Sequence, residues 1–156
     1  MEAITDIETG WLAGQWDGEG SVGISKTASK GYFVQAQMTS TCERTLAHVA
    51  DLLSKIGVDS TTYTATPKQE HHKPQWHLKV RGGHRAILAL GQHIAPHSVT
   101  KRDLWLDVMS WLEQRAARNP HGARGIPYTE ADVELAERIR ERHRRPKPNW
   151  KPKEAA

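Results

Sequence analysis

Cysteine is almost absent from this sequence of 156 residues, which contains only Cys42. A single thiol excludes an intrachain disulfide. Long apolar runs are also missing: none approaches the roughly 18 residues that a membrane-spanning helix requires, and the N-terminal stretch lacks the pattern of a signal peptide. We therefore expect a protein that is not secreted, does not engage a membrane, and is located in the cytoplasm or an organelle.

Basic residues are missing from the first 25 positions, which carry five acidic side chains and a net charge of −5. The whole chain has 22 Lys and Arg against 18 Asp and Glu, a net charge of +4, so the remaining residues carry +9. A basic surface favours a polyanionic partner such as nucleic acid. The acidic N-terminal segment must serve a different purpose.

Hydrophobic periodicity predicts helices and strands in an order that repeats along the chain. The order of helix, strand and strand occurs twice and is followed by a helix, which predicts an α+β domain with a four-stranded antiparallel sheet and helices on one face. We expect residues 1–118 to form the core, and residues 119–156 to add a helix, capped by Thr129 and Asp132, and a basic arm. The expected helices are 5–18, 43–55, 85–93, 101–118 and 129–145, and the expected strands are 21–27, 32–39, 61–66 and 75–81.

Two glycines lie on one stripe of the first expected helix. Gly10 and Gly14 are four positions apart, with Ala13 and Asp17 beside them. Glycine inside a helix costs up to about 1 kcal/mol relative to alanine, so two of them on one stripe require a compensating contact. Close approach of a second helix supplies one, which predicts a helix pair packed along Gly10, Ala13, Gly14 and Asp17.

Two carboxylates, Asp17 and Glu19, stand at the C-terminal end of this helix. The helix dipole is negative there and disfavours each carboxylate by about 0.3 to 1 kcal/mol. The first 25 residues offer no Lys or Arg to compensate, whereas a divalent cation would. A carboxylate together with the exposed carbonyls of a helix end suits Mg²⁺, which binds hard oxygen ligands and keeps several waters.

The segment from Leu12 to Ser21, LAGQWDGEGS, resembles the signature of the LAGLIDADG homing endonucleases. The predicted order of elements is also similar to that family's repeat unit, over roughly residues 5–111. The resemblance implies the αββαββα fold of the family and, because the signature occurs once, a homodimer. It further implies site-specific hydrolysis of double-stranded DNA at a long, near-palindromic target, with Mg²⁺ as cofactor and Mn²⁺ able to substitute.

The resemblance also implies roles for individual residues. Glu19 takes the place of the metal-binding acid, and the carbonyl of Gly18 is a second ligand. Asp17 is the neighbouring acid of the catalytic group, with a structural role at the helix junction. Lys101, which follows the stretch IAPHSVT, takes the place of the active-site lysine. Two further catalytic candidates match positions that order solvent near the metal, namely Ser40 and Arg44.

The polar faces of the predicted strands are the expected DNA-binding surface, because a twisted sheet can follow the major groove. There Gln can pair with adenine, and Arg or Lys with guanine. By strand alternation the expected base contacts are Ser25, Thr27, Phe33, Gln35, Gln37, Thr62, Thr64, Gln75, His77, Lys79 and Arg81. The expected phosphate contacts are Lys26, Lys30, Lys68, Lys73 and the C-terminal arm.

Two alternatives stay open at this stage. A protein of the same fold could bind nucleic acid without cutting it, as an intron RNA maturase or a DNA-binding regulator. The basic helix at 129–145 could instead dock on another protein. The presence of Glu19 and Lys101 favours cutting. Salt-sensitive nucleic-acid binding would separate the endonuclease and the non-cutting binder from a protein that docks on another protein.

Overall fold

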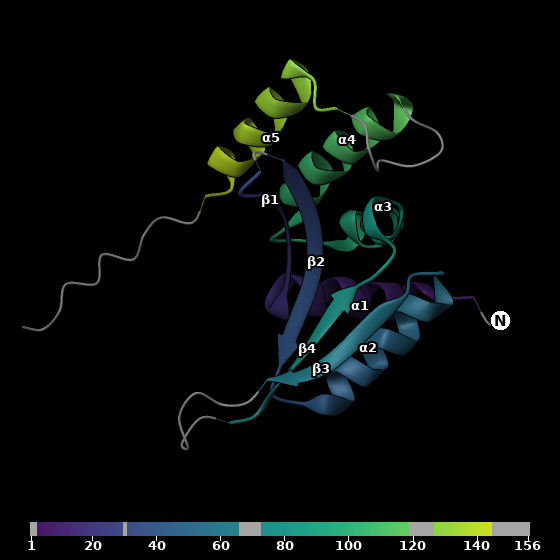
Figure 1. Ribbon diagram of the computed structural model, residues 1–156. Coiled ribbons are helices and arrows are strands. Elements are labelled where there is room, and N and C mark those ends of the chain that lie inside the picture. The colour runs from purple at the N-terminus through teal and green to yellow at the C-terminus, as the bar shows by residue number, and fades with distance from the viewer. Residues whose placement is uncertain (1–2, 30, 66–72, 119–126, 145–156) are drawn as a thin grey trace, which may run out of the picture.

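The computed structural model describes residues 3–29, 31–65, 73–118 and 127–144 (Figure 1). Lys30, Lys68, most of the segment between the last two predicted helices, and the basic arm beyond residue 144 lie outside the described residues. No helix in the described ranges is long and apolar enough to cross a membrane.

The predicted order of elements is confirmed, and the bounds differ from the predicted ones by at most three residues. A short 3₁₀ helix, η1, lies between the third and fourth α-helices and was not predicted. The elements are α1 (Asp6–Glu19), β1 (Gly20–Lys26), β2 (Tyr32–Ser40), α2 (Glu43–Lys55), β3 (Ser60–Ala65), β4 (Gln75–Val80), α3 (Gly83–Ile94), η1 (Ala95–His97), α4 (Arg102–Arg118) and α5 (Glu130–Arg142).

The four strands form one antiparallel sheet in the order β1-β2-β4-β3. Its concealed face carries the alternating apolar residues of β1 and β2, and α1, α2 and α3 pack on that side (Figure 1). α4 packs on α3 and β1, and α5 contacts both α4 and β1. The predicted α+β class, with helices gathered on one face of the sheet, is therefore confirmed.

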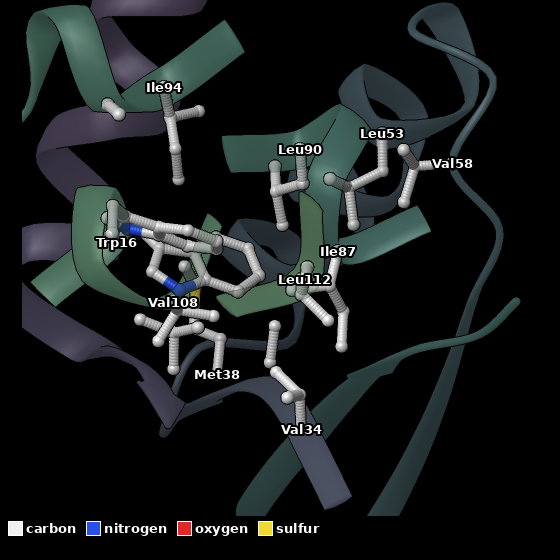
Figure 2. Packing of buried hydrophobic residues seen from close by; sticks show 14 of the residues in the cluster. Trp16, Val34, Met38, Leu53, Val58, Ile87, Leu90, Ile94, Val108 and Leu112 are labelled. Carbon is white, nitrogen blue, oxygen red and sulfur yellow. The ribbon is translucent and has the colours of Figure 1, made fainter. Parts of the chain in front are cut away.

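The core lies between the sheet and the helices. Trp16 of α1, Met38 of β2 and Leu90 of α3 are fully buried in one cluster with Trp105 (Figure 2). Trp16 occupies a signature position that is usually a smaller apolar residue, and its ring fills the space beside Gly20. A Cβ atom at Gly20 would lie 2.5 Å from Cδ1 of Trp16, so the strand can leave the helix here only with glycine.

Ala13 is fully buried within the chain, which corrects its predicted place on a stripe facing a second helix. Leu12 and Trp16 are also at zero exposure, so this side of α1 is the one that faces the sheet. The sequence pattern misled because Ala13 is small enough to suit a close helix pair and apolar enough to suit the core.

A buried ion-pair cluster fastens α5 to α4. Asp132 is fully buried, accepts a hydrogen bond from Arg115 at 3.0 Å and pairs with Arg118. The same carboxylate accepts from the amide of Thr129 at 3.0 Å, so the predicted capping box is confirmed. Arg115 is also fully buried, and the apolar pattern of α4 did not predict the burial of this side chain.

Candidate functional site

The end of α1 is held by the segment that follows η1. Both carboxylate oxygens of Asp17 accept two hydrogen bonds each, which come from the Ser98 hydroxyl at 2.5 Å and the amides of Val99, Thr100 and Lys101 at 2.6, 3.1 and 3.2 Å. Partial burial raises the pKa of Asp17, but these hydrogen bonds outweigh that effect and lower the pKa below its usual value. The acceptor capacity of Asp17 is thus used inside the chain, which agrees with its predicted structural role next to Glu19, while its place at a dimer interface stays a prediction.

Lys101 also holds this helix end through its side chain. Its ammonium group donates to the carbonyls of Trp16, Asp17 and Gly20 at 2.7, 2.6 and 2.7 Å. A cation at a helix C-terminus offsets the negative end of the dipole. The compensating charge that the first 25 residues lack therefore comes from a lysine far along the chain, so a metal ion is not needed for that purpose. Lys101 lies beside the segment that carries Glu19.

Glu19 is the exposed acid of this helix end. No hydrogen bond or ion pair among the described residues involves its carboxylate, and Gly18 beside it is exposed as well. Within the same residues no group of three or more acidic, His or Cys side chains could hold a metal by itself. One carboxylate and a helix-end carbonyl suit Mg²⁺, which takes few protein ligands, so the donor set fits such an ion when further oxygens come from outside the chain.

Ser40 and Arg44 lie at the corner where β2 ends and α2 begins. Gly20 pairs with Met38, and this antiparallel register brings Ser40, two residues further along β2, beside the end of α1. The Ser40 hydroxyl accepts a hydrogen bond from the Cys42 amide at 3.1 Å, and Arg44 is exposed in the first turn of α2. Ser40 and Arg44 thus lie near the junction of α1 and β1, and their role in ordering solvent stays a prediction.

The sheet face opposite the helices is polar. Ser25 pairs with Phe33, and Gln37 pairs with Lys79, so the alternation predicted for β1, β2 and β4 places these side chains on the exposed face together. Phe33 is 42% exposed there. This exposed sheet face also carries Gln35, Gln75 and His77.

For β3 the predicted alternation is wrong by one residue. Thr62 pairs with Leu78 and Thr64 with Trp76, which puts both threonines on the helix side of the sheet. Tyr63 pairs with His77 and belongs to the exposed face, although the sequence interpretation had missed it. The sequence STTYTA has no apolar alternation, and only its pairing with β4 fixes which residues face outward. The same register adds Thr61, and that of β2 adds Thr39.

Two predicted base contacts lie beyond the strand ends. The hydroxyl of Thr27 accepts a hydrogen bond from the Gly31 amide at 3.0 Å and is part of the hairpin turn. The amide of Arg81 donates to the carbonyl of Asp59 at 2.7 Å, just after β4. Their side chains sit at the margins of the exposed sheet face and not within its regular alternation.

One stripe of α1 is largely open, although the ring of Trp11 contacts that of His48 in α2, with centroids 4.7 Å apart. Ile7 is 85% exposed and Trp11 is 37% exposed, and Gly14 and Gly18 continue the same line at spacings of three and four. A Cβ atom added at Gly10, Gly14 or Gly18 would meet nothing within 4 Å. The glycines that the sequence analysis singled out therefore lie on an open, partly apolar surface, which we call the α1 stripe (Ile7, Gly10, Trp11, Gly14 and Gly18).

Comparison with known proteins is consistent with this geometry. A family model described as a LAGLIDADG-like domain matches residues 6–89, which include α1, the whole sheet and most of α3. No curated protein sequence matches the chain.

Solved structures of homing endonucleases share the fold. The archaeal intron-encoded homing endonuclease I-Vdi141I, complexed with DNA, has a TM-score of 0.65 at 14% identity, over 94% of this chain and 90% of that one. The homing endonuclease I-CvuI, bound to the I-CreI target with 2 mM Mg and with its DNA not cleaved, has a TM-score of 0.58 at 14% identity, over 85% and 80%. A second I-CvuI complex, with 2 mM Ca, gives 0.50 at 14% identity, over 85% and 94%. At this identity the likeness is one of fold.

Proposed function

This chain belongs to the LAGLIDADG-like family, and on that premise we propose that it is a homodimeric, site-specific endonuclease that hydrolyses phosphodiesters in double-stranded DNA with a divalent metal ion. The observation that carries the proposal is the geometry at the end of α1. Glu19 is exposed with no partner among the described residues, while Asp17 and Lys101 hold the backbone on which it stands. A metal ligand must be accessible and held in a fixed position, and an exposed carboxylate on a fixed backbone meets both requirements.

The α1 stripe supports the homodimer. Because the signature occurs once, a single chain offers one copy of Glu19, and pairing of two α1 helices along Gly10 and Gly14 would bring two such ends together. The exposed Ile7 and Trp11 would be buried in that contact. A twofold protein implies a near-palindromic target, since each copy presents the same sheet face to one half-site.

The partners of the relatives support DNA as the substrate. I-Vdi141I and I-CvuI are both described in complexes with DNA, and the I-CvuI complexes were formed with Mg or Ca. We propose Mg²⁺ as the cofactor of this chain, with Mn²⁺ able to substitute. The exposed sheet face offers amide, hydroxyl and ammonium groups to the edges of the bases, and Lys73 lies exposed where it can contact phosphates. Lys26, by contrast, pairs with Glu137 of α5 at 3.2 Å on the helix side of the sheet.

The residues at the C-terminal end of α1 would have different roles in hydrolysis. Glu19 and the carbonyl of Gly18 would hold the ion, which supplies Lewis-acid activation of water and of the leaving oxygen when it is bound. The ammonium group of Lys101 adds positive charge beside the scissile phosphate, where negative charge develops. Ser40 and Arg44 would order water at the neighbouring strand end.

The test is selection from a randomised duplex library in Mg²⁺ and in Ca²⁺, with Glu19→Gln and the matched control Glu113→Gln on the exposed side of α4. We expect the wild type and the control to cut one near-palindromic sequence in Mg²⁺. Glu19→Gln should bind the same sequence without cutting it, because the substitution removes a charge and little volume. Unchanged cutting by Glu19→Gln would contradict the assignment, and loss of binding as well would make Glu19 structural.

One observation favours a second candidate, a non-cleaving nucleic-acid binder such as an intron RNA maturase or a DNA-binding regulator. The Lys101 ammonium contacts three backbone carbonyls, so the site residues also serve to hold the helix end together. Such a role would persist in a protein that no longer cuts. Specific binding without cutting in either metal would support this candidate, and enrichment of intron RNA in place of DNA would identify a maturase.

A further inference from the structure

Four side chains form a connected group on the exposed sheet face, which we call the His77 cluster (Thr39, Tyr63, His77 and Lys79). The Nδ1 atom of His77 lies 3.0 Å from the hydroxyl of Thr39. The ring of Tyr63 stacks on the His77 ring, with centroids 5.2 Å apart and planes 14° from parallel. The ammonium group of Lys79 lies 5.6 Å from the centroid of Tyr63.

The strand register brings these residues together. Thr39 of β2 and Tyr63 of β3 both pair with His77 of β4, so the three side chains form one row across the sheet. Lys79 follows His77 by two residues and therefore shares its face. No other row of the described sheet places an aromatic ring, an imidazole and a hydroxyl side by side.

The row fixes the orientation of the imidazole. Thr39 engages Nδ1 and Tyr63 covers one ring face, which leaves Nε2 as the ring nitrogen that can meet a ligand from outside. Tyr63 is 42% exposed, so the row is open to a large partner. Because the ring is held before binding, little side-chain entropy is lost when Nε2 makes a contact.

We propose that the His77 cluster is a preformed reader of one guanine in each half-site of the DNA target. The inference rests on the proposed DNA-binding function and names the base contact that this row makes. The Thr39 hydroxyl donates to Nδ1, which makes Nε2 the protonated nitrogen, and Nε2 then donates to the N7 acceptor of guanine in the major groove. Lys79, a donor only, adds positive charge on the side of the O6 acceptor, which adenine lacks. Thr39 and Tyr63 are positioning residues that act through His77.

The experiment compares base preference at every position of the selected target for the wild type, His77→Ala and Thr39→Val. We expect both variants to lose preference at the same symmetric pair of guanines, by roughly fivefold or more in affinity ratio, with other positions unchanged. Thr39→Val keeps the shape of the side chain and removes only the hydroxyl. The matched control is Thr62→Val, the same substitution on the helix side of β3, which should leave the profile unaltered.

A second measurement tests the atom involved. Replacement of the identified guanine by 7-deazaguanine and by inosine separates the N7 contact from general purine shape. We expect 7-deazaguanine to weaken wild-type binding and to leave His77→Ala binding unchanged, whereas inosine keeps N7 and O6 and should be tolerated by both. An unchanged profile in His77→Ala, or relaxation at different positions in Thr39→Val and His77→Ala, would overturn the inference while the wild type still binds specifically. Absence of specific DNA binding by the wild type would instead overturn the proposed function and the inference with it.

Discussion

The amide of Lys101 donates to the Asp17 carboxylate at 3.2 Å, and the Lys101 ammonium group donates to the Asp17 carbonyl at 2.6 Å. Two residues 84 positions apart in the chain are therefore joined by two hydrogen bonds, in each of which the side chain of one residue bonds to the backbone of the other. The contact ties the end of α1 to the segment before α4 and fixes the backbone from which Glu19 projects. Loss of either partner should disturb the geometry at Glu19 as well as the stability of the fold.

Substitution of Asp17 by Asn should lower the free energy of unfolding by about 2 kcal/mol at pH 7, because hydrogen bonds to a charged acceptor are worth about 1.5–3 kcal/mol. The lowered pKa of Asp17 means that its contribution is present above the pKa of an unfolded aspartate and is lost as the pH falls through the folded value. Urea unfolding from pH 7 to pH 3 should therefore show the variant and the wild type converging at low pH. The exposed substitution Asp51→Asn is the control, and a constant difference across this range would contradict the prediction.

Glu8 links the first turn of α1 to the end of α2. The ammonium group of Lys55 donates to its carboxylate at 2.7 Å, and the Thr5 amide donates at 2.8 Å. These bonds, that of Lys55 first, lower the pKa of Glu8 from 4.5 to about 2. The stabilisation is thus present above about pH 4.5 and is lost as the pH falls towards 2. Carboxyl NMR titration should find the low value, Lys55→Met should raise it, and an ordinary value in the wild type would refute the assignment.

Substitution of Asp132 by Ala should be among the most destabilising single changes in the protein. It leaves Arg115, fully buried, without this carboxylate and removes the Asp132 half of the capping box of α5. Breaking a buried ion pair by deleting one partner costs about 3–5 kcal/mol. Glu130→Ala, in the exposed first turn of the same helix, should stay within about 0.5 kcal/mol of the wild type. Equal effects of the two substitutions in urea unfolding would show that the ion pair contributes little.

The fold could be read from the sequence because its signals are local and periodic. The alternation of β2 and the apolar spacing of α2 each specify one buried face, and the observed elements follow them closely. β3 carries no such alternation, so the face of the sheet on which Tyr63 lies is set only by pairing with β4, ten or more residues away. Long-range pairing is the information that a single sequence does not contain.

In the candidate site, too, local features could be predicted from the sequence and long-range contacts could not. Glu19 and Gly18 could be singled out from a short motif, because the end of a helix and the residues on it are local features. The partners of Asp17 and the carbonyls bound by Lys101 could not, since each contact joins α1 to a segment more than 80 residues later. Ala13 shows the converse failure, because a small apolar residue fits a helix pair and a core equally well.

Substitution of Gly14 by Leu should separate the stability of the single chain from its association. A side chain at this position meets nothing within 4 Å inside the chain, and replacing a helical glycine gains up to about 1 kcal/mol, so the monomer should be as stable as the wild type or more stable. At a close helix pair the same side chain would overpack the interface at a cost of about 1–3 kcal/mol, or roughly 5- to 150-fold in dimer Kd. Analytical ultracentrifugation over a concentration series measures the dimer, and urea unfolding measures the chain. Ala116→Leu on the exposed side of α4 is the control, and a Gly14→Leu protein that dimerises like this control would place the interface away from the α1 stripe.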